Sequence, residues 1–379
     1  MRKTRYVSGG LIVAAIVIAG CQSEAGTSPP SKLGTPQTVS SSILPLSVLG
    51  ASHVPPGQAC GAAEYHQFDF WVGNWDVHNA NGSLAGTNVV TSRLGGCVVE
   101  ENWTGLNLGH GRSLNFFDAS TKTWSQMWVS SGGCPTGVII IEGTFANGSM
   151  TMIGSKEQPE GFILAPPCIG GQPVTAYSRT NRIRWTPIDG GAVLQEFTAS
   201  NNGDPLPPLG PPSVNNGYRY DPVATVTPLN PPDPSYCPNR AAAHQFDYML
   251  GTWRVHEGNG TGAQATAVFT ADQQHCLIEE NFTGPDKYEG LSFNTFDVFT
   301  QKWHRTFVDT DGQRLLMAGV VENGSMVLTS TRAAAGGQSV MVRISWIPEG
   351  TDRVVQRWEF SRDGGSSWGS TKELVYTRA

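Results

Sequence analysis

The sequence is poor in charge and lacks the signatures of several large functional classes. Only 15% of its 379 residues are Asp, Glu, Lys or Arg, and they form no long basic run. Because phosphate backbones are held by clustered Lys and Arg, nucleic acid is not an expected partner. The chain also lacks a G-x-S-x-G elbow, a P-loop and an H-E-x-x-H helix. We therefore assign no catalytic residue, no metal ligand and no cofactor from the sequence.

Helical periodicity is missing as well. Outside the N-terminal segment, no stretch of ten or more residues repeats its hydrophobic residues with a helical period. β-Branched and aromatic segments are instead separated by Gly, Asn, Asp and Pro at intervals of about 8 to 12 residues, which is typical of hairpin-linked antiparallel barrels and sandwiches. Short helical turns are compatible with residues 62–65 and 241–243.

The N-terminal segment predicts export and lipidation. MRKTR precedes an apolar run, GGLIVAAIVIAG, that is shorter than the roughly 20 residues of a membrane-spanning helix. The IAGC that ends at Cys21 resembles a bacterial lipobox, which implies cleavage before Cys21 and its acylation; an ordinary cleaved signal peptide is the alternative. Lipid on Cys21 would anchor the protein to a membrane. Gln22, where Asp would indicate the inner membrane, favours the outer membrane, facing the periplasm or the cell surface. Cleavage removes three positive charges and moves the net charge from -6 to -9.

Two near-identical phrases indicate an internal duplication. HQFDFWVGNWDV at His66 returns as HQFDYMLGTWRV at His244, and five further blocks recur in the same order, among them CVVEENWTG and CLIEENFTG. Two homologous domains of about 150 residues follow from this repeat. We predict a signal peptide over 1–20, a flexible tether over 21–58, a β-barrel over 59–222, a linker over 223–236 and a second β-barrel over 237–379.

The duplicated phrase resembles a known kind of barrel. GNW at Gly73 and GTW at Gly251 are similar to the G-x-W motif of lipocalin-like barrels, in which Trp closes the floor. FDFWVGNWDV looks like the signature of a mostly bacterial family of lipocalin-like (calycin-type) domains of unknown function, and FD-x-x-T-x-x-W agrees with it. The resemblance implies an all-β fold of two tandem antiparallel barrels with about eight to ten strands each. It implies no activity, and no His follows His304 where haem-binding nitrobindin-type barrels carry their proximal ligand.

The cysteines predict disulfides in an oxidising compartment. The seven Cys become six once Cys21 carries lipid, and an even number in a secreted protein favours pairing. In each copy one Cys precedes the HQFD phrase and another begins the EEN segment. A metal site is the alternative, but no C-x-x-C spacing supports it. The predicted bonds join Cys60 to Cys97, Cys237 to Cys276 and, in the first copy alone, Cys134 to Cys168.

Each copy carries a glutamate that strand alternation places beside aromatic residues. Glu101 shares a face with Trp103, and Glu280 shares the equivalent face with Phe282. If this face points into the barrel, the carboxyl is a polar anchor for a ligand, and burial would raise its pKa. A structural carboxylate, or an outward face that leaves the preceding glutamate inside, is the alternative. The predicted ligand-binding residues are Glu101, Glu280, Trp75, Trp253, Trp103, Phe282, Trp124, Trp303, Gln126 and Arg305.

Other motifs have structural interpretations. His66 with Asp69 and His244 with Asp247 recur in both copies; such pairs act as general bases in enzymes but also cap backbone groups. SRDGGSSW, residues 361–368, resembles the Asp-box hairpin, in which Asp and Ser fix a turn over a packed Trp, far from any catalysis.

These observations favour an envelope-anchored protein that binds a small apolar or amphipathic ligand inside its barrels. No nucleophile paired with a base is recognisable. One alternative is a structural or interaction protein of the envelope with filled barrels, for which eleven Trp would suffice. The other is an enzyme that uses a cavity Glu with a His. Because Gln126 in one copy corresponds to Arg305 in the other, we expect the two copies to differ in their ligands.

Overall fold

The computed structural model describes residues 59–107, 109–131, 138–158, 177–230, 237, 241–258, 264–333 and 339–379. The predicted signal peptide, the tether, the lipidation site Cys21 and the predicted pair Cys134–Cys168 lie outside the described residues. Within these described ranges, no helix has both the length and the apolar composition needed to span a membrane.

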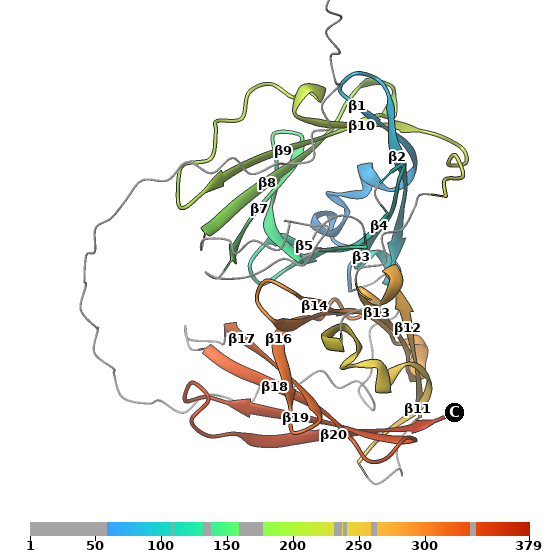
Figure 1. The fold of residues 1–379 in the computed structure, drawn as a ribbon, viewed down its shortest axis with the longest axis vertical. Coiled ribbons are helices and arrows are strands. Elements are labelled where there is room, and N and C mark those ends of the chain that lie inside the picture. The colour runs from blue at the N-terminus through green and yellow to red at the C-terminus, as the bar shows by residue number, and fades with distance from the viewer. Residues whose placement is uncertain are drawn as a thin grey trace, which may run out of the picture. The chain divides into compact units, whose positions relative to one another are not determined.

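The first copy folds into a closed antiparallel barrel of ten strands, coloured from blue to yellow-green in Figure 1. Consecutive strands pair with one another, and β1 closes the barrel by pairing with β10. The strands are β1 Gly73–Asn79, β2 Leu84–Arg93, β3 Val98–Gly105, β4 His110–Asp118, β5 Thr123–Ser130, β6 Ile139–Ala146, β7 Ser149–Gln158, β8 Tyr177–Pro187, β9 Val193–Asn201 and β10 Gly217–Pro222.

The second copy repeats this topology, and β11 pairs with β20 to close it. Its strands are β11 Gly251–Glu257, β12 Ala265–Asp272, β13 Leu277–Thr283, β14 Glu289–Asp297, β15 Lys302–Asp309, β16 Arg314–Glu322, β17 Ser325–Ala333, β18 Ser339–Pro348, β19 Arg353–Ser361 and β20 Gly369–Arg378. The predicted fold of two tandem all-β barrels is confirmed.

The helices are single 3₁₀ turns. In each barrel two of them precede the first strand and one links the second strand to the third. They are η1 Ala63–His66, η2 Asp69–Trp71, η3 Leu94–Gly96, η4 Asp189–Gly191, η5 Val214–Asn216, η6 Ala241–His244, η7 Asp247–Met249, η8 Gln273–His275 and η9 Pro285–Lys287.

The duplicated HQFD phrase forms the aromatic core at one end of each barrel. Phe68 is fully buried and its ring lies 5.0 Å from Trp71 and 5.3 Å from Trp185 of β8. In the second copy, Phe246 lies 5.6 Å from Trp346 of β18. Each such aromatic removes a large apolar surface from water. The repeated phrase therefore supplies buried aromatic residues to the core of both barrels.

The G-x-W start of the second barrel has a specific geometry. Gly251 has a φ of +112°, and a Cβ there would come within 2.6 Å of the Arg378 guanidinium. Arg378 lies over the ring of Trp253 at 4.0 Å, and the Trp253 indole N–H donates to the Met249 carbonyl at 2.6 Å. Glycine is favoured here because L side chains rarely adopt this φ, whereas the end of the flexible Arg378 side chain could move aside.

Disulfides join the segment before each barrel to the start of its third strand. Cys60 is bonded to Cys97 and Cys237 to Cys276, and the Cα atoms are 5.1 Å apart in each pair. These two predicted bonds are confirmed.

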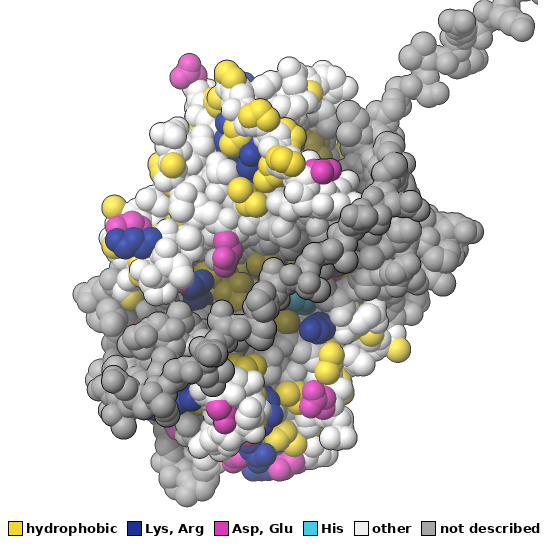
Figure 2. All heavy atoms as spheres, turned by 90° about the vertical axis from the view of Figure 1, so that its left-hand side faces the viewer, with side chains coloured by type: hydrophobic (Ala, Val, Ile, Leu, Met, Phe, Trp, Pro, Cys, Tyr) yellow, Lys and Arg dark blue, Asp and Glu magenta, His cyan; other side chains and the backbone are white. Residues whose placement is uncertain are grey.

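On the face drawn in Figure 2, the acidic, basic and hydrophobic side chains of the described residues lie in small groups among other residues. Among these described residues, no continuous stripe of one charge is visible on this face.

Candidate functional site

Strand register directs one glutamate of each EEN segment into its barrel. In β13, Glu280 lies opposite Ser292 of β14, and in β3, Glu101 lies opposite Ser113 of β4. Both serine hydroxyls donate to the facing carboxyl group, at 2.9 Å for Ser292 and 2.7 Å for Ser113. The two copies thus build equivalent interior carboxyl sites.

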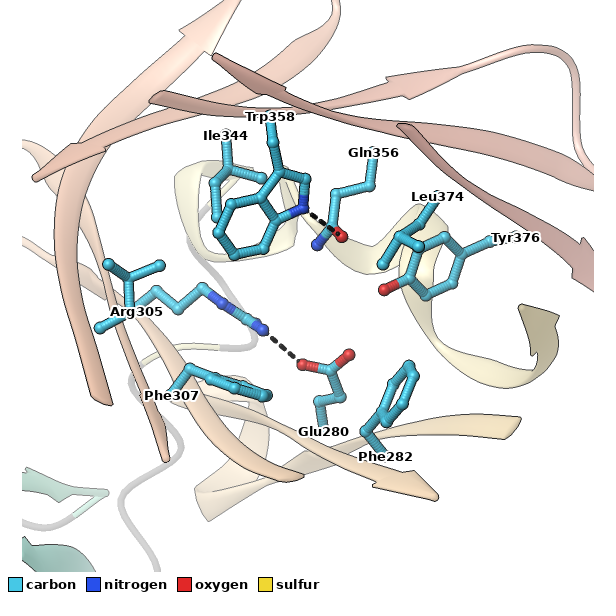
Figure 3. A pocket seen from close by; sticks show the side chains of 10 residues that line it. Glu280, Phe282, Arg305, Phe307, Ile344, Gln356, Trp358, Leu374 and Tyr376 are labelled. Atoms are coloured by element: carbon cyan, nitrogen blue, oxygen red, sulfur yellow. Dashed lines mark hydrogen bonds and ion pairs between the residues drawn. The ribbon is translucent and has the colours of Figure 1, made fainter. Parts of the chain in front are cut away.

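The second barrel holds a small cavity around Glu280. Its volume, counted as the space open to the centre of a water molecule, is about 20 Å³, so it has room for little more than one water. In Figure 3 its side chains converge from β13, β15, β18, β19 and β20. The lining residues are Glu280, Phe282, Arg305, Phe307, Leu315, Ile344, Gln356, Trp358, Leu374 and Tyr376.

The Arg305 side chain extends from β15 into this interior (Figure 3). Its guanidinium pairs with Glu280 at 2.6 Å (Figure 3) and also donates to Ser292 at 2.7 Å and Asn294 at 2.8 Å. The same group lies 5.1 Å from the ring centre of Trp346. A buried charge requires a partner and hydrogen bonds, and Arg305 obtains both from the second barrel itself.

The first barrel lacks this cation. Gln126 takes the position of Arg305, and its amide donates to Asn115 Oδ1 at 2.7 Å instead of to the glutamate. Glu101 is 3% exposed and accepts hydrogen bonds from Asn88 at 2.7 Å and from Ser113. Burial raises the pKa of Glu101 from its ordinary value of 4.5 to about 7, partly offset by these two hydrogen bonds.

Asn88 is a second polar difference between the copies. It pairs with Trp103, whereas Ala267 pairs with the equivalent Phe282. Asn88 is fully buried, and its Oδ1 has no hydrogen-bond partner among the described residues. Asn88 Oδ1 is therefore an enclosed oxygen acceptor without a donor beside the buried Glu101 carboxyl group, and such an acceptor is costly.

The remaining predicted residues lie in two regions of the interior. Trp103 packs 6.1 Å from Tyr218. The paired Trp residues of the first and fifth strands belong to the aromatic core instead, and in the second barrel they do not line the cavity. This group comprises Trp75, Trp124, Trp253 and Trp303.

The acidic and histidine residues left as alternatives lie away from these carboxyl sites. Glu100 pairs with Arg93 at 2.6 Å. His66 contacts Asp69 at 2.7 Å and about half of each side chain is exposed. No histidine of the described residues lines the second-barrel cavity.

Sequence reasoning missed several residues of the sites. Asn88 and the aromatic residues Phe307, Trp346 and Trp358 were not selected. Each lies on an inward position of its strand, two residues from another buried position, so alternation within the repeated blocks would have found the three aromatic residues. Asn88 has no such signal, since Ala267 replaces it in the other copy.

Comparison with known proteins adds little. No protein-family model matches the chain. A search of curated proteins finds no match either. Among solved structures, the chain is similar to a protein of unknown function from the DUF3598 family of Nostoc punctiforme PCC 73102, with 12% identity over 84% of this chain and 100% of that chain. The TM-score is 0.18, which is too low to support an inference about this chain.

Proposed function

We propose that the first barrel binds a small organic cation with an apolar body, and that the second barrel is a structural copy closed by its own arginine. The observation that carries this proposal is the unpartnered Asn88 Oδ1 beside the buried Glu101 carboxyl group, at a place where the other copy holds the Arg305 guanidinium. A cationic ligand group would donate to Asn88 Oδ1 and compensate the charge of Glu101.

The groups that surround Arg305 in the second barrel indicate which ligand would fit the equivalent position of the first barrel. These acid and polar groups, Glu280, Ser292 and Asn294, have the counterparts Glu101, Ser113 and Asn115 in the first barrel. Arg305 fills this frame with a planar cation on a three-carbon stem, set against aromatic rings. The matching frame in the first barrel therefore favours a guanidinium or ammonium group on a short apolar stem.

Electrostatics favour a cation over a neutral ligand. An ionised carboxylate is costly in this buried position, which is why the pKa of Glu101 rises to about 7. A bound cation would offset that cost, and charge-assisted hydrogen bonds are about twice as strong as neutral ones. Binding should therefore strengthen as the pH rises from 5 to 8 and Glu101 loses its proton.

The test uses the full chain and the probe propylguanidinium, followed by isothermal titration calorimetry at pH 8. Propylurea, which is neutral and of similar shape, and butyrate, an anion, are the matched controls. We expect saturable binding of the cation alone, weakened about tenfold or more by Glu101→Gln and unchanged by Glu280→Gln. Native mass spectrometry of freshly purified protein would show whether a small molecule is retained.

Exchanging the residues that distinguish the copies gives a sharper test. Gln126→Arg should place a guanidinium beside Glu101 and abolish probe binding. Arg305→Gln should give the second barrel a vacant frame and add a weak second site. Probe binding that persists in Gln126→Arg, or equal binding of cation and anion, would show that Glu101 is not the anchor.

The other functions receive unequal support. The small cavity and the enclosed Arg305 favour a structural role for the second barrel. An enzyme that pairs a cavity Glu with a His is less supported, because Glu101 accepts its hydrogen bonds from Asn88 and Ser113.

Anchoring to the envelope is part of the proposal and is supported by the sequence alone. Cys21 in its lipobox-like setting would carry the lipid. Cys21→Ser should move the protein from the membrane fraction to the soluble fraction if acylation holds it, whereas unchanged fractionation would exclude that anchor.

A further inference from the structure

Three potential metal ligands meet outside the cavity of the second barrel. His244 ends η6, Asp247 begins η7 and His275 ends η8. The His244 Nδ1 lies 2.6 Å from Asp247 Oδ2, and the His275 Nε2 lies 3.7 Å from the same oxygen. One ligand atom from each residue lies within 4.8 Å of the other two. The two imidazole rings are 4.7 Å apart.

The first barrel has two of these residues but not the third. His66 and Asp69 repeat the pair at 2.7 Å, and Gly96 ends η3 where His275 ends η8. A Cβ built on Gly96 would lie 3.4 Å from the His66 ring. The first barrel therefore has two of the three potential metal ligands and the second barrel has all three, so the two copies can be compared directly.

His275 adopts a backbone conformation that disfavours a side chain. Its φ is +64°, and Gly96 has a φ of +95° at the same place. Left-handed conformations are readily accepted by glycine and cost energy for other residues. Gln274 also replaces a glycine, Gly95, at positive φ in this loop, so the feature that singles out His275 is the position of its imidazole beside Asp247.

Asp247 gives an independent indication. Its Oδ1 is shielded from solvent and has no hydrogen-bond partner within the described part of the chain, while its Oδ2 faces both imidazoles. An enclosed carboxylate oxygen without a donor is unfavourable. An ion between the carboxylate and the two imidazoles would compensate it.

We propose that His244, Asp247 and His275 bind a divalent first-row transition metal ion, with Zn²⁺ as the representative case. Two imidazoles and one carboxylate form a ligand set that suits Zn²⁺ and leaves a fourth position for water. Tetrahedral bonds of about 2.0 to 2.2 Å place ligand atoms about 3.4 Å apart. The observed separations of 2.6 and 3.7 Å lie on either side of this value, so small side-chain rotations suffice.

The surrounding structure fixes the donors in place. His275 directly precedes Cys276, whose disulfide to Cys237 joins this loop to the segment before η6. A preorganised set loses little conformational entropy on binding. None of the three residues lines the Glu280 cavity, so this site is independent of the proposed ligand-binding function.

The test uses the full chain, purified without a polyhistidine tag and treated with a chelator. Calorimetric titration with Zn²⁺ should give one site per chain, and Co²⁺ should give the visible absorption of a low-symmetry site. His275→Gly recreates the loop of the first copy and should weaken Zn²⁺ binding by about a hundredfold or more, since even residues that only orient ligands cost ten- to a hundredfold. Asp247→Asn should have a similar effect.

Two controls separate a metal site from a structural cluster. His66→Ala removes a histidine of the incomplete set and should leave Zn²⁺ affinity unchanged. His275→Gly should raise the melting temperature of the metal-free protein, because it relieves the left-handed backbone, yet remove the further rise that Zn²⁺ causes in the wild type. Absence of stoichiometric binding in the wild type, or equal affinity in His275→Gly, would overturn the proposal.

Discussion

Replacing Glu101 with Gln is expected to stabilise the first barrel at alkaline pH, even though it removes a buried interior residue. The pKa of Glu101 is raised from 4.5 to about 7 by burial. The folded state therefore holds this proton more tightly than the unfolded state, and stability falls as the pH rises from about 4.5 through 7. Gln resembles the protonated form and carries no charge to bury.

The size of the effect follows from that difference. The rise from 4.5 to about 7 corresponds to about 3 kcal/mol in the free energy of unfolding at pH 8.5 and to less than about 1 kcal/mol at pH 5. The Ser113 hydroxyl, which now donates to Glu101 and accepts from Asn115, must reorient towards the new amide. This reorientation costs about 1 kcal/mol at either pH. The difference that Glu101→Gln makes to the free energy of unfolding between pH 5 and pH 8.5 is therefore unaffected.

Urea unfolding of the full chain at pH 5 and pH 8.5 measures the prediction, and hydrogen exchange assigns the change to the first barrel. Burial also raises the pKa of Asp309 to about 7. Asp309 is present in both the wild type and Glu101→Gln, so its contribution cancels in the difference between their free energies of unfolding. The matched control is Glu280→Gln, which leaves the Arg305 cation without its carboxylate and should destabilise the second barrel by about 3 kcal/mol. If both substitutions destabilise the protein at pH 8.5, or if the effect of Glu101→Gln does not depend on pH, the assignment of an unpaired carboxyl is refuted.

Three further predictions concern the scaffold. Replacing both Cys60 and Cys97 with Ala should lower the free energy of unfolding by about 4 kcal/mol, given their separation of 37 residues, as measured by urea unfolding; an unchanged midpoint would exclude a stabilising bond. Trp71→Ala, at a fully buried position, should cost about 3 to 5 kcal/mol, seen as a lower melting temperature, and a loss below 1 kcal/mol would contradict its place in the aromatic core. Asp363 accepts hydrogen bonds from Ser367 and Ser361, which lower its pKa. Asp363→Ala should lower the melting temperature of the second barrel while leaving probe binding by the first barrel intact, and loss of that binding would contradict a purely local role in the turn.

The sequence alone determined the fold to a large extent. Duplication of the HQFD phrase predicted two copies of one fold, and short β-branched segments between turn residues predicted an all-β architecture; the structure has two closed barrels. The position of one Cys before each phrase and one at each EEN segment was enough to pair Cys60 with Cys97 and Cys237 with Cys276. These features are readable because strand alternation and repeat spacing are local properties of the chain.

The sequence showed that Gln126 and Arg305 differ between the copies, but the tertiary structure decided which partners they have. Alternation places Glu101 and Glu280 on equivalent faces, but only the folded structure shows that Asn88 of the neighbouring strand donates to Glu101 and that Arg305, two strands after Glu280, pairs with it. The same is true of His275, which meets His244 and Asp247 through a loop far along the chain. Which charges are compensated depends on contacts across the barrel and on burial, and a linear pattern contains neither.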